Sequence, residues 1–496
     1  MRRLAPALLL AVLATACGSS SRRVGSLVAR GPADTIRVAL PGYRWPLDPA
    51  SVAGHDELTL AHALLATPLT TDSRSGALRP GLCRSWTSTN GGRTWRFRCT
   101  HAAAIAAELQ RMRRLPRSPA GWLFAPIAGL ERSGSTLTFT LRFPWLRFPY
   151  VLTVPAAAPR GVVGPFTVAS ATAERLIARR GRVHLVFSRL VAVDAVRAWR
   201  DGQIDEAPVP LGDLQRFRLD SAISPFVRVR PLLGVDLVLL GLPSGPLADL
   251  PHTRRVYWQT ANRADYAQLV AGGAASPAFS VAGSGRAPGP AALRQARRDV
   301  ASLPPVSVSI ATPPDSELRY AAETLVADWR ELGLGPRVVG RSSGARFERL
   351  VAAYPQDEAL PAALLLQGDF RGRRLLLDAL AQRDQTAALA RVDAVLRAES
   401  AVVPIAGVAS ARLVSSRLQR WRQDALGVVD YTAVKARAGT RRRLGGAAKR
   451  TCGLRPCVRQ STFRPRKPGN QMPGFDPEPV MLKRAVAIAG TSAPYG

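Results

Sequence analysis

The sequence predicts an α/β protein with two or more hydrophobic cores, and three observations support this class. The chain has 496 residues, which is long enough for more than one core. Apolar residues make up 47% of it and charged residues 21%, a mixture typical of globular proteins rather than disordered ones. A β-α-β pattern between residues 306 and 339 implies parallel strands, which occur in α/β layers.

The β-α-β pattern starts with the stretch VSVSI at 306–310, which predicts a strand. A helix is predicted to follow Ser316, with Gly333 just beyond its end, and 336–339 begins the next strand. The apolar residues of this helix recur at helical spacing and predict one buried face: Leu318, Ala322, Leu325, Trp329 and Leu332. We expect core packing for Trp329, rather than a role as a ligand platform.

Further elements are predicted by periodicity in the first third of the chain. Residues 35–40 and 133–142 alternate as strands, and residues 55–68 and 102–114 are expected to be helical. Beyond the first residues, no stretch of eighteen or more apolar residues exists, so no transmembrane helix is predicted.

The first residues read MRRLAPALLLAVLATACGSSS and predict an export signal. Two arginines precede an apolar stretch too short to span a bilayer, and small residues lead to Cys17. This resembles a bacterial lipoprotein signal, 1–17, in which Cys17 becomes the lipid anchor and 18–34 a Ser-rich tether. The alternative is an ordinary secretory signal cut near Ala16. In either case the mature chain lies outside the cytoplasm, where disulfides persist.

The stretch PGLCRSWTSTNGGRTWRFRC at 80–99 predicts a β-hairpin around Asn-Gly-Gly. A three-residue loop at 90–92 places Cys83 directly opposite Cys99, where a disulfide can form. A two-residue loop shifts the pairing by one residue and prevents this. Cys452 and Cys457 remain as a separate pair near the C-terminus, and four cysteines allow three connectivities. We expect the Cys83–Cys99 pairing, which staples an exposed hairpin.

The net charge of +34 raises the question of a polyanionic partner. The basic residues are scattered, and the only four lysines fall in the last 62 residues, a bias typical of codon usage in a GC-rich genome. A specific nucleic-acid function is therefore not expected. Residues 435–496 contain fourteen basic and two acidic residues without apolar periodicity, and we expect a disordered basic tail or an artefact of gene prediction.

A series of short motifs, in order along residues 35–434, resembles the peptide/nickel (family 5) group of extracellular solute-binding proteins, the receptors of ABC importers. The matching stretches are Leu47-Asp48-Pro49, residues 67–72 with Gly76 and Pro80, Trp86 with the Gly-Gly-x-Thr-Trp-x-Phe hairpin at 91–97, residues 137–144, Gly164-Pro165-Phe166, Gly202-Gln203-Ile204-Asp205, residues 254–263, Gly272-Gly273 with Pro277, and Val403-Pro404-Ile405. The chain departs from the family pattern after the hairpin, where a loop is missing, and at Asn262, where the family has aspartate. It resembles a diverged member.

The resemblance implies a two-lobed periplasmic-binding-protein-like fold that closes on its ligand about a hinge. Lobe one is expected at 35–241, with 406–434 returning to it, and lobe two at 242–405. The hinge strands are expected at 235–240 and 402–405.

Peptide-binding members of this group hold the ligand amine with an aspartate followed by an aromatic residue. Asp369 and Phe370 match that pair, and a carboxylate facing an ammonium in a desolvated cleft is a strong contact. The alternative is that Asp369 merely starts a loop. Trp45 and Tyr43 are candidates to line the cleft, with surface packing as the alternative.

Motifs of the common enzyme classes are missing. The five histidines form no zinc motif, and neither a Gly-x-Ser-x-Gly elbow nor a Walker A loop occurs. We therefore expect no enzyme activity, no metal and no cofactor.

The sequence predicts a monomeric, lipid-anchored, extracytoplasmic receptor that captures an oligopeptide or similar small solute for an ABC permease. The alternative is a secreted basic protein that uses the same fold for signalling or for binding envelope polyanions.

Overall fold

In a computed structural model of the chain, the structure describes residues 31–438 except 116–117, 244, 283–284, 314–315, 341–343 and 369. The predicted signal, Cys17 and the tether up to residue 30 lie outside the described residues, as do Asp369 and both tail cysteines. None of the described helices is both long and apolar enough to cross a membrane.

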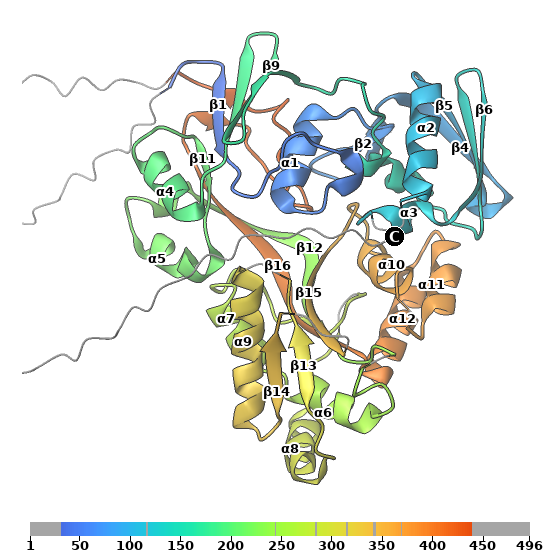
Figure 1. Cartoon of the computed structure of the whole chain (residues 1–496), viewed down its shortest axis with the longest axis vertical. Helices are drawn as coiled ribbons and strands as arrows, with labels where there is room; N and C mark the ends of the chain where they lie inside the picture. The colour runs from blue at the N-terminus through green and yellow to red at the C-terminus, as the bar shows by residue number, and fades with distance from the viewer. Residues whose placement is uncertain are drawn as a thin grey trace, which may run out of the picture. The chain divides into compact units, whose positions relative to one another are not determined.

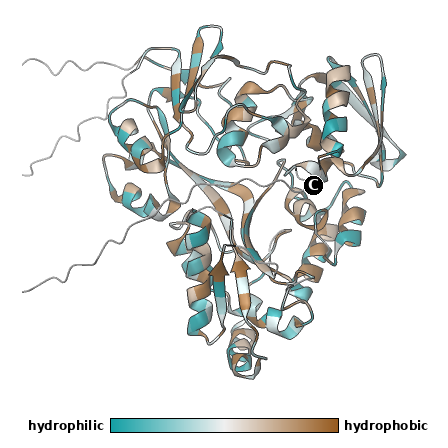
Figure 2. Ribbon diagram, viewed as in Figure 1, coloured by the Kyte–Doolittle hydropathy of each residue, from teal (hydrophilic) through white to brown (hydrophobic). Residues whose placement is uncertain are grey.

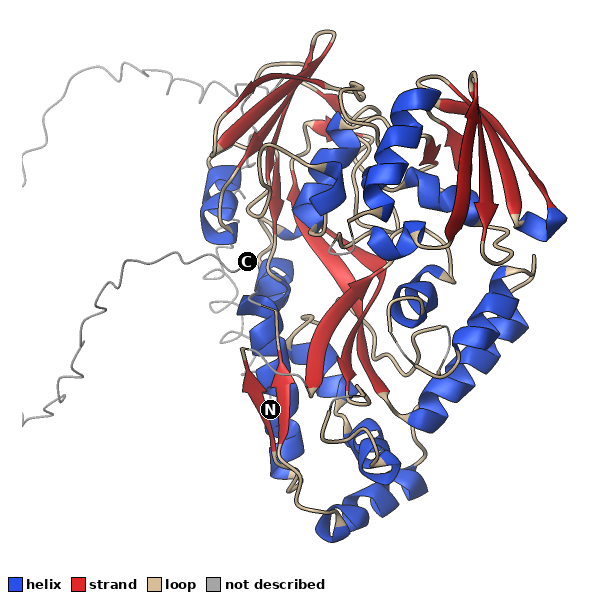
Figure 3. Ribbon diagram, turned by 45° about the vertical axis from the view of Figure 1, so that its right-hand side comes forward, coloured by secondary structure: helices blue, strands red, loops and turns tan. Residues whose placement is uncertain are grey.

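A mixed sheet of ten strands runs through the described part of the chain (Figures 1 and 3). Its two longest strands, β12 (Val227–Leu239) and β16 (Val402–Val414), are antiparallel neighbours of 13 residues each. Nearly all of β16 and the last five residues of β12 are buried, and most of these residues are apolar. The strand order is β14-β13-β15-β12-β16-β11-β1-β10-β9-β8. The other strands are β1 (Thr35–Ala39), β8 (Thr167–Ala171), β9 (Arg175–Arg180), β10 (Val183–Ser188), β11 (Glu206–Pro208), β13 (Val308–Ala311), β14 (Pro336–Val339) and β15 (Ala345–Val351).

The first predicted strand forms as β1, which pairs in parallel with β10 and β11. Ile36 and Val38 alternate with polar residues and are fully buried, as the period of two requires. The predicted helix at 55–68 is the shorter α1, which ends at Leu64. The other helices of this part of the chain are α4 (Ala192–Arg200) and α5 (Leu214–Leu219), in addition to α1 (His55–Leu64).

The predicted β-α-β unit is confirmed as β13, α9 and β14. The two strands pair in parallel, with Val308 opposite Pro336, and α9 (Ser316–Glu331) connects them. Trp329 is fully buried and lies edge-on to Tyr257 with the ring centroids 4.9 Å apart, so it is a core residue as expected. Figure 2 shows the hydrophobic strands of this unit beside helices of mixed hydropathy. The neighbouring helices are α6 (Pro251–Thr260), α7 (Arg263–Leu269) and α8 (Pro290–Asp299).

A separate four-stranded sheet follows the order β4-β5-β7-β6. Phe97, Leu137 and Phe139 are buried on its inner face, toward helix α2. Its elements are β4 (Cys83–Thr89), β5 (Thr94–Cys99), α2 (Ala102–Arg113), α3 (Gly121–Phe124), β6 (Ile127–Ser133) and β7 (Thr136–Leu141), preceded by the short pair β2 (Leu69–Thr71) and β3 (Leu78–Pro80).

The hairpin in this sheet contains the predicted disulfide, but its loop differs from the prediction. Thr89 pairs with Thr94, so the loop has four residues, 90–93, instead of three. That loop alone would misalign the cysteines. A register shift between Cys83 and Ser85, a β-bulge, corrects the alignment, so Cys83 is opposite Cys99 and bonded to it. The pairing prediction is confirmed, and the predicted loop length was wrong. Both cysteines are buried although most of β4 is exposed.

One hydrophobic core joins the four-stranded sheet to three helices of the predicted lobe two (Figure 1). These helices are α10 (Ala359–Leu365), α11 (Arg373–Leu380) and α12 (Thr386–Glu399). The ring centroids of Trp145 and Tyr354 are 6.4 Å apart, and the Leu146 N–H donates to the Leu380 carbonyl at 2.9 Å. Residues on both sides of the predicted lobe boundary are therefore packed together without intervening solvent at this contact.

The predicted start of the disordered tail needs a correction. Lys435 and Ala436 form strand β18 (Lys435–Ala436), which pairs with β17 (Leu418–Gln419). The Arg417 guanidinium donates to the carbonyl of Arg437 at 2.8 Å, which holds this end of the chain. Ordered structure thus continues past residue 435, because pairing with a distant strand compensates for the missing apolar periodicity. The rest of the predicted tail, from residue 439, lies outside the described residues.

Candidate functional site

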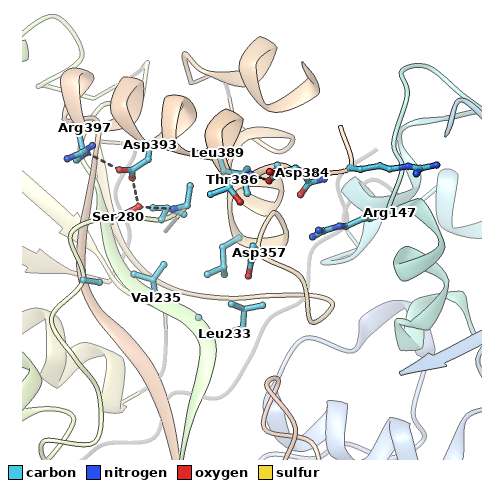
Figure 4. A pocket seen from close by; sticks show the side chains of 18 residues that line it. Arg147, Leu233, Val235, Ser280, Asp357, Asp384, Thr386, Leu389, Asp393 and Arg397 are labelled. Atoms are coloured by element: carbon cyan, nitrogen blue, oxygen red, sulfur yellow. Dashed lines mark hydrogen bonds and ion pairs between the residues drawn. The ribbon is translucent and has the colours of Figure 1, made fainter. Parts of the chain in front are cut away.

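A cavity of about 540 Å³ lies against β12 and is the candidate site (Figure 4). Its walls are residues 233–235 of β12, residues 278–282, residues 357 and 360 near the start of α10, residues 383–397 around α12, and Arg147. The β12–β16 pairing shifts between Leu232 and Val235, so Leu233 and Gly234 do not pair with β16 where they meet the cavity, although Gly234 still pairs with Val351 of β15. Bulges commonly redirect a strand next to a functional site in this way.

One end of the cavity is built on Asp393 of α12. The Ser280 hydroxyl donates to Asp393 Oδ1, and Arg397 Nε lies 2.9 Å from Asp393 Oδ2 (Figure 4). Burial raises the pKa of Asp393, and the hydroxyl and guanidinium partly oppose this rise. This carboxylate is satisfied within the protein, so its role is to hold the 278–282 segment against α12.

The other end of the cavity carries Arg147, Asp384 and Asp357 (Figure 4). Arg147 Nη1 donates to Glu358 Oε2 at 2.9 Å, and Glu358 is fully buried behind it. Burial raises the pKa of Glu358, against the attraction of Arg147. Asp384 Oδ1 accepts the Thr386 N–H at 3.0 Å, and this bond lowers the pKa of Asp384. Asp384 precedes the N-cap Gln385 and therefore satisfies the first N–H group of α12.

The charges on the cavity wall are balanced, in contrast to the chain as a whole. Three arginines (147, 383 and 397) face three aspartates (357, 384 and 393) in the lining. Apolar residues such as Leu233, Val281 and Leu389 complete it. A site with apolar walls and a few polar groups of both signs suits a neutral or zwitterionic small molecule.

The four binding residues predicted from the sequence lie apart from this lining as far as the structure describes them. Tyr43 is 1% exposed and belongs to a core with Leu60 and Phe166. Trp45 is 39% exposed. Phe370 is half-buried against the core of α10 and α11. Asp369 lies outside the described residues, so its role stays a prediction.

The sequence prediction named none of the residues that line this cavity as binding residues. The one local signal was the start of a helix at Asp384 and Thr386, which indicates a cap and not a site. Most of the other walls come from segments more than a hundred positions away, such as 233–235 and Arg147. Within the described parts of 31–438, no group of three or more His, Cys, Asp or Glu side chains is arranged to hold a metal ion.

No protein-family profile matches this chain, and no curated protein sequence matches it significantly. Solved structures do match. The murein tripeptide binding protein MppA of Escherichia coli aligns with a TM-score of 0.69 at 16% identity, over 82% of this chain and 99% of MppA. OppA of Haemophilus influenzae, in complex with RPPGFSPFR, gives 0.69 at 15% identity over 82% and 99%.

DppA from Helicobacter pylori, in complex with the peptide STSA, aligns with a TM-score of 0.68 at 14% identity, over 83% of this chain and 99% of DppA. At such low identities the agreement concerns the fold, and it spans nearly the whole length of each of these proteins. The two-lobed α/β architecture implied by the sequence motifs is thereby confirmed. The chain therefore shares its fold with MppA, OppA and DppA, in agreement with the resemblance of its motifs to the peptide/nickel (family 5) group of solute-binding proteins.

Proposed function

We propose that this chain is an extracytoplasmic receptor that captures a short peptide, or a similar small solute, and presents it to an ABC permease. The observation that carries the proposal is the 540 Å³ cavity against β12 in this fold. Among the solved proteins that share the fold, MppA is a murein tripeptide binding protein, OppA was solved in complex with RPPGFSPFR, and DppA in complex with STSA. A cavity of this volume suits a ligand at the short end of that range.

The charge balance of the cavity supports a zwitterionic ligand. A free peptide carries one ammonium and one carboxylate, and the lining offers aspartates and arginines in equal number. Arg383 is exposed and forms no ion pair with a described residue, so it is available to a ligand carboxylate. Asp369 is proposed to bind the ligand amine, with Phe370 beside it, and Trp45 remains a proposed cleft residue, whereas the buried Tyr43 supports the core behind it.

Hinge closure is the proposed mechanism, with lobe one at 35–241 and 406–434 and lobe two at 242–405. The order of the large sheet supports this division, because β12 and β16 separate β13–β15 from β1 and β8–β11. Leu237, Val238 and Leu239 pair with Pro404, Val403 and Val402, which are the strand segments proposed as the hinge. Binding is proposed to shift the receptor toward its closed state without any bond chemistry.

The setting of the receptor is part of the proposal. The predicted export signal supports an extracytoplasmic chain, anchored through Cys17 to lipid. We propose a monomer that docks on its permease through the closed lobes.

Native mass spectrometry of the secreted mature chain tests the proposed function, with spectra recorded before and after denaturation. We expect a small mass that is released on unfolding, and thermal stabilisation by a library of di- to tetrapeptides. N-terminal acetylation of the best peptide, and separately Asp369→Asn, are expected to weaken binding. A chain that is empty and is stabilised by no peptide would argue against the proposal.

The polyanion alternative has one observation in its favour, the net charge of +34. That charge is not concentrated in the cavity, where arginines and aspartates are equal in number. Retention on heparin that survives removal of residues 439–496, in a protein that binds no peptide, would favour this alternative.

A further inference from the structure

Gln385 stands out among the polar residues of the cavity. It directly precedes α12, it lines the cavity, and it is only 3% exposed. Among the described residues, neither its amide nitrogen nor its amide oxygen has a hydrogen-bond partner. Both a donor and an acceptor of one side chain are thus buried and unpaired at the cavity wall.

An unpaired amide of this kind lowers the stability of the folded protein. It has given up its hydrogen bonds to water without gaining any within the chain. Buried polar groups in native proteins are nearly always paired, so an exception calls for an explanation. A methionine in the same place would fill similar space without that cost.

Four of the six charged residues of the cavity lining differ from Gln385 in this respect. Asp393 is bound by Ser280 and Arg397, Asp384 by the Thr386 N–H, and Arg147 by Glu358. These side chains are already paired within the protein, so their role is to shape the cavity wall. Gln385 is free to pair with a molecule that enters the cavity.

The chemistry of the partner follows from the chemistry of the side chain. A carboxamide presents a carbonyl oxygen and an NH2 group side by side in one plane, and the N–H and C=O of one extended residue of a peptide backbone complement both at once. A ligand with only acceptors or only donors would leave half of Gln385 unpaired. We propose that Gln385 is a specificity-determining residue that recognises the backbone N–H and C=O of one residue of a short peptide ligand by a pair of antiparallel hydrogen bonds.

This inference rests on the proposed function and deepens it, because it names Gln385 as the side chain by which the site distinguishes a ligand with an amide from an ester or a sugar. Sites that hydrogen-bond a ligand group reject analogues that lack it, since their own polar groups are then left unpaired.

Gln385→Met tests the inference in the full mature chain, with Gln423→Met as the matched control. Gln423 is equally buried and only its Oε1 is unpaired, because its Nε2 donates to Ser410 Oγ at 3.0 Å and to the Gly427 carbonyl at 2.8 Å. Without ligand, Gln385→Met is expected to melt at the same or a higher temperature than the wild type. Gln423→Met is expected to melt at a lower temperature, because it breaks two hydrogen bonds.

Binding is measured by titration calorimetry with the tightest member of a tripeptide library, and with its depsipeptide, in which an ester replaces one amide. Gln385→Met is expected to bind the tripeptide at least tenfold more weakly. Each amide of the tripeptide is replaced by an ester in turn. One of these esters should weaken binding to the wild type as much as Gln385→Met does, and should not weaken binding to Gln385→Met any further. That result indicates a direct contact between Gln385 and the replaced amide.

The outcomes separate the two proposals. Wild-type protein that binds no tripeptide overturns the proposed function and this inference with it. Wild-type protein that binds, with Gln385→Met binding equally well, overturns the inference alone. A ligand-free Gln385→Met that is as destabilised as Gln423→Met also overturns it, because the amide would then be paired within the protein.

Discussion

Arg147 Nη1 lies 2.9 Å from Glu358 Oε2, and this ion pair joins two segments that are 211 positions apart in the chain. The rings of Tyr150 and Tyr354 stack beside it with centroids 6.1 Å apart. Arg147 also lines the cavity, so the pair fixes one wall of the candidate site while it holds the proposed lobes together.

Arg147→Met is expected to destabilise the protein by about 3 kcal/mol at pH 7.5, because it leaves the buried Glu358 without a counter-charge. Loss of Arg147 raises the pKa of Glu358 further. The destabilisation should therefore be present above that pKa and vanish as the pH falls below it, where Glu358 is neutral. Urea denaturation curves across pH measure this.

Two variants control for that result. Arg319→Met breaks an ion pair of the same 2.9 Å length with Glu323, but both residues are exposed, so less than about 0.5 kcal/mol is expected. Adding Glu358→Gln to Arg147→Met should restore most of the lost stability. A double variant as unstable as the single one would mean that packing, and not charge, holds this contact.

The double change Cys83→Ala with Cys99→Ala is expected to cost about 3 kcal/mol of unfolding free energy, because it releases a loop closed over a separation of 16 residues. The effect is measured by urea denaturation of the variant beside the wild type, each with and without reductant. Reductant should destabilise only the wild type. Alkylation of both cysteines in unreduced secreted protein would contradict the disulfide.

His55 is expected to make the protein sensitive to acid. Burial, helped by Arg412, lowers the pKa of His55 to about 3. The unfolded chain therefore binds a proton between pH 6.5 and 3 that the folded chain does not, and stability falls as pH falls through this window, by up to about 4 kcal/mol.

His55→Gln should remove this part of the acid response. Between pH 6.5 and 3.5 the free energy of unfolding should therefore fall less for the variant than for the wild type. Denaturation curves at each pH measure the difference. The same change at exposed His184 is the control and should follow the wild type. A pH-independent difference at position 55 would contradict the prediction.

Arg383→Gln is expected to weaken the binding of a peptide with a free carboxylate by about threefold, the modest effect of an exposed charge pair. The same peptide with a C-terminal amide should bind wild type and variant equally. Arg391→Gln on the exposed side of α12, outside the cavity lining, is the matched control in calorimetric titrations. Equal weakening of both peptides would show that Arg383 does not meet the carboxylate.

The sequence by itself determined the features that depend on local periodicity and covalent chemistry. The burial of Ile36, Val38 and Trp329 follows from the spacing of apolar residues along a strand or helix. The disulfide between Cys83 and Cys99 follows from the hairpin, although a bulge was needed to realise it. The order of the family motifs indicated the two-lobed fold.

Only the tertiary structure decided where the cavity lies and which polar groups in it are paired. In the sequence, Gln385 and Gln423 are two ordinary glutamines, and no periodicity distinguishes them. Gln423 has partners because Ser410 and Gly427 lie within reach, and Gln385 has none because the segments packed around α12 bring no donor or acceptor to it. Whether a buried polar group finds a hydrogen-bond partner depends on which distant segments pack against it. The residues next to it along the chain do not contain that information.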